Sequence, residues 1–203
     1  FVAVRLTVEK LSERLTMAGL EVIAAEKKGN DTLLEIEVTP NRPDLLSHIG
    51  IAREIAALTG TRLTLPKIPH TVHRKPYTKK SPLRISIRDK GCLRYIGRLF
   101  DGVQVGVAPS WMRERLERLG LRSVNNIVDI TNYVLLEAGQ PLHAFDYDKI
   151  EGGEVIIRSA RRGETLLTID GENRVLQEGE LVIADSKKAI AIAGVIGGKG
   201  TEI

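Results

Sequence analysis

The chain is predicted to be an α+β protein, with a small N-terminal α+β domain followed by a larger mixed α/β domain. Apolar residues recur at spacings of three and four in several segments, which is typical of amphipathic helices. Short β-branched runs bounded by glycine lie between and after these segments and indicate strands. A proline-rich basic stretch over 62–82 separates the two patterns, so we expect domains at 1–61 and 83–203 joined by a connector.

The first 61 residues predict two helices around a hairpin. Leu11 and Leu15 lie on one face of the first helix, and Gly19 is a stop signal. In order, the elements are a helix over 8–17, strands over 21–23 and 32–38, a rigid turn over 39–44, and a helix from Leu45 to Gly60.

The connector contains four prolines and the basic run His70–Lys80. A second basic run, Arg113–Arg122, lies in a predicted helix. Clustered lysine and arginine attract phosphate groups, but for each run taken singly a solvated linker or an ordinary exposed helix face is the better explanation. His70 and His73 have no third ligand nearby in sequence, so no metal site is expected there.

The larger domain is predicted to begin with strands, continue through two helices and end in a strand-rich region. Asp170-Gly171 is a hairpin turn signal. The predicted elements are strands over 84–87 and 92–99, helices over 110–119 and 123–136, and strands over 142–145, 154–159, 164–169, 174–176, 180–184 and 189–195.

The stretch 122–146 is the strongest candidate for a functional site. Ser123 is the expected N-cap of its helix, and Gly139 suits the left-handed position that ends one. The short strand after Pro141 then brings His143 close to polar side chains that precede it. Those side chains are the amides of Asn126, Asn132 and Gln140. They could line a pocket, or they could cap turns around a core histidine.

The glycine-rich run 194–200 could bring backbone N–H groups to an anion, or it could be a tight turn between strands. His143 could hydrogen-bond an ester or pass a proton, since its ordinary pKa is about 6.5. Arg122 offers a planar fork for phosphate or carboxylate. Together with Asn132, these residues suit a polar substrate that is phosphorylated at one end.

Composition excludes several classes of protein. The single Cys92 allows no intrachain disulfide, and no Cys/His group suggests structural zinc. No apolar run is long enough to span a membrane and no secretory signal is present, so a cytoplasmic protein is expected. Aromatic residues make up only 4% of the chain, which disfavours a base-stacking platform. Walker, GxGxxG and Ser-His-Asp patterns are absent from the sequence.

A series of ordered motifs resembles the beta subunit of bacterial phenylalanyl-tRNA synthetase. The motifs are TMAGLEV (16–22), VTPNRPD (38–44), GIAREIA (50–56), PSWM (109–112), VDITNYV (128–134), QPLHAFD (140–146) and AGVIGG (193–198). The resemblance implies that 1–61 is the subunit's small N-terminal domain and that 83–203 belongs to its editing domain.

The resemblance further implies a proofreading role, namely hydrolysis of tyrosine mistakenly attached to tRNA(Phe). The aminoacylation site, with its ATP and magnesium, would lie on the alpha subunit, so no cofactor is expected in this chain. The implied partners are tRNA(Phe) and that alpha subunit, with no membrane. By the same resemblance the catalytic positions are His143, Asn132 and Thr131, and the positions that bind the substrate or the tRNA end are Arg122, Gly194 and Gln140.

The chain departs from the family pattern in two places. Only Ile23–Leu34 stands where the family inserts an OB-fold tRNA-binding module. The family's glutamate that senses the tyrosine hydroxyl would follow Ile203, so we expect the isolated chain to edit weakly. Two alternatives are a free-standing hydrolase of mischarged tRNA and a non-catalytic module for tRNA binding or subunit docking.

Overall fold

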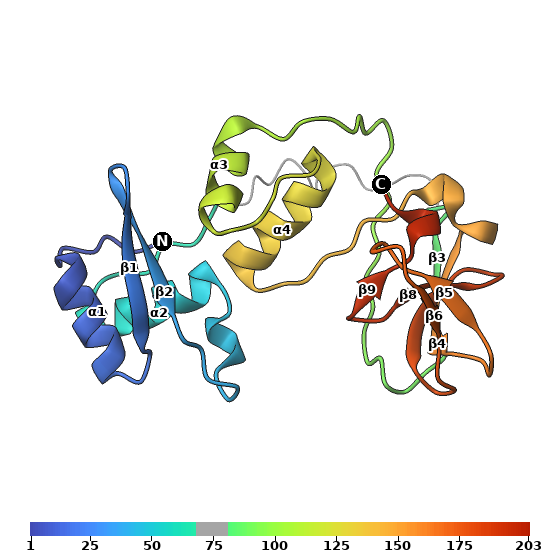
Figure 1. The fold of residues 1–203 in the computed structure, drawn as a ribbon, viewed down its shortest axis with the longest axis horizontal. Helices are drawn as coiled ribbons and strands as arrows, with labels where there is room; N and C mark the ends of the chain where they lie inside the picture. Colours follow the sequence, from blue (N-terminus) through green and yellow to red (C-terminus); the bar gives the residue numbers. More distant parts are fainter. Residues whose placement is uncertain (68–80) are drawn as a thin grey trace. The chain divides into compact units, whose positions relative to one another are not determined.

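The computed structural model describes residues 1–67 and 81–203 and shows helices together with antiparallel and mixed sheets, which confirms the α+β class (Figure 1). Two compact units are present: Phe1–His70 with Gly106–Leu142, and Thr71–Val105 with His143–Ile203. The boundaries of these units differ from those of the predicted domains, and the predicted domain boundaries stay a prediction. His70, His73 and the basic run up to Lys80 lie outside the described residues.

The N-terminal part of the first unit forms as its local signals predict. Helix α1 (Val8–Met17) has the predicted bounds and begins at Thr7, whose side chain accepts a hydrogen bond from the Lys10 backbone N–H. Strands β1 (Val22–Lys28) and β2 (Asp31–Ile36) form an antiparallel hairpin. Its core is small and aliphatic, centred on Leu15, Leu20 and Leu45.

A short 3-10 turn, η1 (Pro43–Leu45), leads into α2 (His48–Thr59). Ser47 caps the start of α2, and Gly60 ends it with φ of 66°. Gly50 lies against the preceding turn so closely that a Cβ there would stand 1.9 Å from the Asp44 carbonyl oxygen. Position 50, in the first turn of α2, therefore has no room for a side chain and requires glycine.

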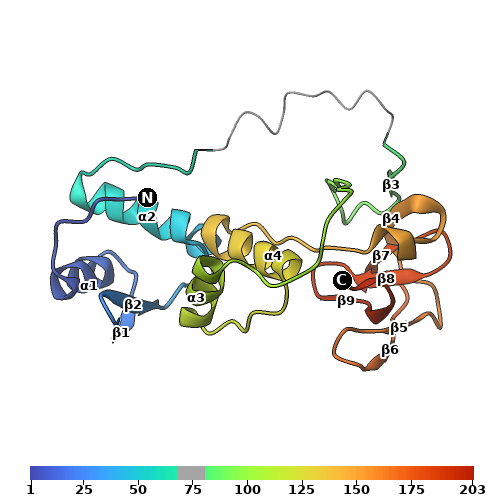
Figure 2. The ribbon, with the colours of Figure 1, turned by 90° about the horizontal axis from the view of Figure 1, so that it is seen from above.

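Helices α3 (Ser110–Arg118) and α4 (Asn126–Ala138) lie side by side in both views of the first unit (Figure 1 and Figure 2). Trp111 and Tyr133 join them edge to face, with ring centroids 5.4 Å apart. The exposed His48 has its Nδ1 2.9 Å from the Leu136 carbonyl oxygen and so links α2 to α4.

The second unit is built on a five-stranded sheet in the order β3-β4-β7-β8-β9. Strand β3 pairs with β4 in parallel, and the remaining pairs are antiparallel. The bounds are Arg84–Ile87, Glu154–Ser159, Leu181–Ala184, Ala189–Ile192 and Ile196–Gly197. Successive residues of β4 enter different apolar clusters, Ile156 one and Val155 and Ile157 the other, so the middle of the sheet is covered on both faces.

Strands β5 (Thr165–Leu167) and β6 (Asn173–Val175) form a separate hairpin across the predicted Asp170-Gly171 turn. The hairpin meets the β9 segment where Ile169 N–H donates to the Gly197 carbonyl at 3.0 Å. Short 3-10 turns occupy Tyr147–Lys149 (η3), Glu151–Gly153 (η4) and Lys199–Thr201 (η5).

Two predicted strands are wrong. Residues 92–99 form no strand, and Leu93 is 95% exposed because no neighbouring strand pairs with that segment. Residues 142–145 also form no strand. This segment is held instead at its end, where Phe145 packs against the core and the next residue, Asp146, donates its backbone N–H to the Thr201 carbonyl at 3.0 Å.

Candidate functional site

The predicted site residues fall into two groups that belong to different compact units. Arg122, Thr131, Asn132 and Gln140 lie in the first unit, and His143 and Gly194 lie in the second. The assembly of all six into one site therefore stays a prediction, and each group is described within its own unit.

His143 lies over the β9 strand of the second unit. A Cβ built on Gly197 would stand 2.4 Å from the His143 Cε1 and 2.8 Å from its Nε2, so the imidazole edge rests on the glycine backbone. The Phe145 ring meets the imidazole edge to face, with centroids 4.4 Å apart and planes at 65°. The ring is thus held by contacts on the side that faces the protein.

The remaining side of His143 is open to solvent. Within the described residues, neither ring nitrogen has a hydrogen-bond partner, so both are available to a substrate or to water. Partial burial of the ring lowers the pKa of His143 from its usual 6.5. The imidazole is therefore neutral at physiological pH, with one nitrogen that donates and one that accepts.

Gly194 lies in the turn that joins β8 to β9, where Val195 N–H donates to the Ile192 carbonyl at 3.1 Å. Its φ is 72°, a left-handed conformation that glycine adopts without strain. No atom lies within 4 Å of the position that a Cβ would take. Of the two interpretations from sequence, the structure shows the tight turn, and the open space above Gly194 leaves its backbone accessible.

Helix α4 carries Thr131 and Asn132, both half-buried. The Thr131 hydroxyl donates to the Val128 carbonyl at 2.7 Å, so in this conformation its oxygen can only accept from a substrate. The Asn132 amide has no hydrogen-bond partner among the described residues, and can both donate and accept.

The start of α4 differs from the prediction in a way that positions Arg122. Asn125, not Ser123, is the N-cap and accepts from the Ile127 and Val128 backbone N–H groups. Ser123 instead donates to Asp129 at 2.6 Å. Ser123 is therefore not available as a cap, because a buried carboxylate further along the helix engages it.

Asp129 is fully buried and also accepts from the Val124 backbone N–H at 3.0 Å. Asp129 therefore anchors Ser123 and Val124, the two residues that follow Arg122. The Arg122 side chain is exposed, and its guanidinium has no ion pair within the described part of the chain. Sequence reasoning missed Asp129 as a support of the site. No local pattern indicates this role, because at helical spacing Asp129 lies away from the apolar face that Ile127, Val128 and Thr131 predict.

Gln140 is exposed just beyond α4, which ends as predicted at Gly139 with φ of 75°. Its amide donates to the Pro141 carbonyl at 3.2 Å. Asn126, another predicted amide, accepts from the Gly106 backbone N–H at 3.1 Å and so fastens the chain before α3 to the start of α4. For Asn126 the turn-binding alternative is the better description.

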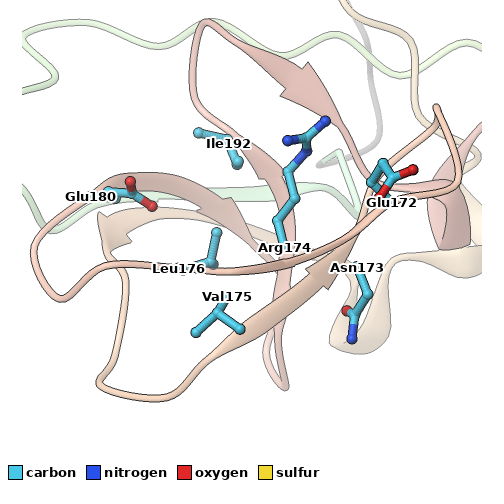
Figure 3. Close-up of a pocket in the computed structure, with 7 residues that line it drawn as sticks. All are labelled: Glu172, Asn173, Arg174, Val175, Leu176, Glu180 and Ile192. Carbon is cyan, nitrogen blue, oxygen red and sulfur yellow. The ribbon is translucent and has the colours of Figure 1, made fainter.

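A pocket of about 460 Å³ lies in the second unit, away from the predicted residues (Figure 3). Figure 3 shows Arg174 reaching up between Glu172 and Ile192, and Glu180 at the far side. The Arg174 guanidinium already pairs with Asp170 at 2.5 Å. With its cation engaged and two carboxylates on the rim, the pocket offers no free charge to an anionic ligand.

The described residues contain no cluster of three or more histidine, cysteine or acidic side chains that could hold a metal ion. No helix in the described part of the chain has the length and apolar character needed to cross a bilayer.

Comparisons with known proteins agree with the motif resemblance. A family model described as B3/4 domain matches residues 91–203. The phenylalanine–tRNA ligase beta subunit of Anaeromyxobacter dehalogenans is 50% identical over 174 residues, which are 86% of this chain and 22% of that protein. The corresponding subunit of Fusobacterium nucleatum is 51% identical over 175 residues, again 86% and 22%.

Among solved structures, an N-terminal fragment of the phenylalanyl-tRNA synthetase beta subunit from Pyrococcus horikoshii matches 98% of this chain and 59% of that one, with 16% identity and a TM-score of 0.48. The chain spans about a fifth of the length of the curated relatives, 22% in each of the two above. The sequence matches confirm the resemblance to the phenylalanyl-tRNA synthetase beta subunit. Because the family model covers more than half of its residues, the chain belongs to the B3/4 domain family.

Proposed function

We propose that this chain is the proofreading region of a phenylalanine–tRNA ligase beta subunit and hydrolyses the ester between tyrosine and tRNA(Phe). The observation that supports this most is the family match over residues 91–203, because that range contains all six predicted site residues. The identity of 50% to a bacterial beta subunit over most of the chain supports the same assignment.

The exposed side of His143 supplies the chemistry. In the proposed reaction water attacks the ester carbonyl, the bond from that carbon to the ribose oxygen breaks, and a proton reaches the departing oxygen. A neutral imidazole can hydrogen-bond the water through one nitrogen and the ester through the other. The lowered pKa of His143 keeps it in this neutral form at physiological pH.

The other site residues would orient the substrate. The Asn132 amide can hydrogen-bond the ester or the terminal adenosine in both senses, and the Thr131 oxygen can accept from a ribose hydroxyl. Arg122 presents an unpaired guanidinium suited to a phosphate of the tRNA end. The open backbone at Gly194 and the exposed amide of Gln140 would contact the substrate at its rim.

Selectivity for tyrosine requires a group that bonds its hydroxyl. An apolar pocket distinguishes tyrosine from phenylalanine weakly, whereas a buried polar group that bonds the hydroxyl gives up to ~10⁴–10⁵-fold discrimination. The roles proposed for Thr131, Asn132 and His143 concern the ester and the tRNA end, and none of them bonds the tyrosine hydroxyl. We therefore expect the chain to hydrolyse tyrosyl and phenylalanyl esters at similar, low rates.

The proposal places the ATP- and magnesium-dependent aminoacylation on an alpha subunit, with which this subunit would assemble. It also places the protein in the cytoplasm, where charged tRNA is used. Neither the alpha subunit nor ATP takes part in the ester hydrolysis itself, because water is the only co-reactant.

The test is deacylation of tyrosyl-tRNA(Phe) and phenylalanyl-tRNA(Phe) by the 203-residue chain and by His143→Ala. We expect both esters to be lost faster than without protein, and the acceleration to disappear in the variant. His48→Ala is the matched control because His48 lies on α2 and has no proposed role in catalysis. Binding of tRNA(Phe) without any acceleration would favour the non-catalytic alternative.

A further inference from the structure

Gly197 is a glycine for a steric reason and not for a conformational one. It is absent from the residues with positive φ, so its backbone would accept any L-residue. A Cβ at this position would nevertheless stand 2.4 Å from the His143 Cε1, 2.8 Å from Nε2 and 3.6 Å from Nδ1. Carbon atoms that are not bonded approach to about 3.5–4.0 Å, so the imidazole and a methyl group cannot occupy these places together.

The backbone of Gly197 is fixed and cannot move aside. It lies in β9 opposite Ala191, and its carbonyl accepts from Ile169 N–H at 3.0 Å. The next residue, Gly198, is equally confined, because a Cβ there would stand 2.6 Å from the Ile190 carbonyl oxygen. If a side chain were introduced at Gly197, the imidazole would therefore yield, since it stands on a flexible side chain.

The imidazole has a second contact that defines its plane. Phe145 meets it edge to face at 4.4 Å, and Phe145 is itself packed against the apolar cluster beneath the sheet. Strand β9 and the core-anchored phenylalanine thus hold His143 in place of the hydrogen bonds that its ring nitrogens lack among the described residues. Both nitrogens remain free for substrate while the ring stays oriented.

We propose that Gly197 is the positioning residue for His143: the missing side chain creates the seat on which the imidazole rests, with Phe145 beside it. This inference rests on the proposed function for its catalytic consequence but not for its structural one. Gly197 acts only through His143 and has no contact with substrate in this scheme.

The first measurement is made with glycine kept at position 197. In the chain labelled with ¹³C-histidine, the signals of His143 are assigned by comparison with His143→Ala. We expect a nuclear Overhauser effect between the His143 Hε1 and the Gly197 Hα protons. Its absence from a folded wild-type chain would overturn the proposal.

The second measurement compares Gly197→Ala with Gly200→Ala. Gly200 lies in the same C-terminal segment, has no positive φ, and a Cβ there would meet only the Lys188 Nζ at 3.8 Å. We expect Gly197→Ala to move the His143 signals and to return its pKa toward 6.5, while Gly200→Ala leaves both unchanged. Unchanged His143 signals in Gly197→Ala would refute the claim that Gly197 positions the imidazole.

Deacylation then separates positioning from fold. We expect kcat for ester hydrolysis to fall about 100-fold in Gly197→Ala, as for displacement of a catalytic group by about 1 Å, with KM for tRNA little changed. If wild type shows no deacylation while the His143 signals respond as expected, the proposed function fails and the positioning role stands. Equal kcat in Gly197→Ala and wild type would overturn the positioning role.

Discussion

Arg158 and Glu164 form the least exposed ion pair among the described residues of the second unit. Two hydrogen bonds, of 2.8 and 2.6 Å, join the guanidinium to the two carboxylate oxygens. The side chains are only 10% and 12% exposed, and Glu164 also accepts from the Arg161 and Ala189 backbone N–H groups at 2.9 Å each. We predict that Glu164→Gln destabilises this unit severely.

The magnitude follows from the pKa of Glu164, which the Arg158 hydrogen bonds lower from 4.5 to about 2. At ~1.36 kcal/mol per pKa unit, this shift corresponds to about 3 kcal/mol of stability from the ionised form. The amide would leave the buried Arg158 without a counter-charge, which typically costs about 3–5 kcal/mol. We therefore expect the free energy of unfolding to fall by about 3 kcal/mol.

The pH dependence has a definite sign. Because the folded-state pKa is lower than the unfolded one, the unfolded chain takes up the proton first as the pH falls. The contribution is fully present above pH 4.5 and is lost as the pH falls toward about 2. In Glu164→Gln the contribution of this carboxyl should be absent, so stability should fall less steeply between pH 4.5 and about 2.

The assay is urea unfolding followed by far-ultraviolet circular dichroism, together with hydrogen exchange of the Ala189 amide. Asp170→Asn is the matched control: Asp170 has a pKa also lowered to about 2, by Thr168 and Arg174, but its side chain is 40% exposed. Water replaces much of the lost interaction at such a site. Equal losses in the two variants would refute the reasoning, and Arg158→Met should recover stability in the Glu164→Gln background.

Two further predictions concern the first unit. Gly50→Ala should destabilise it by about 1–3 kcal/mol through overpacking against the Asp44 carbonyl, measured by urea unfolding with fluorescence of Trp111, the one tryptophan of the chain; an unchanged midpoint would contradict the close contact. Asp129→Ala should cost about 1–3 kcal/mol and speed tryptic cleavage after Arg122, since it removes the two bonds that anchor the following residues; equal cleavage rates would show that this anchor does not order the segment.

Elements with strong local signals could be predicted from the sequence. The bounds of α1 and β4 agree with prediction, and the glycines expected to end α2 and α4, Gly60 and Gly139, both have left-handed conformations. These features depend on caps and periodicity that lie within a few residues. A single sequence therefore suffices for them.

Features that depend on distant partners could not be predicted in this way. The apolar content of residues 92–99 is typical of a strand, but a strand also needs a neighbouring strand that the local pattern does not specify. The prediction that Ser123 is the N-cap was wrong, because the Ser123 hydroxyl donates to the distant side chain of Asp129. At the candidate site, the sequence indicated His143, whereas the role of Gly197 beneath it became visible only when the fold brought residues 143 and 197 into contact.

The most direct test of the proposed editing function is the release of tyrosine from tyrosyl-tRNA(Phe), measured side by side for the chain and for His143→Ala. We predict release above the spontaneous rate with the chain, and release at the spontaneous rate with the variant. Equal acceleration by both proteins would contradict the role of His143, and acceleration by neither would contradict hydrolysis by this chain.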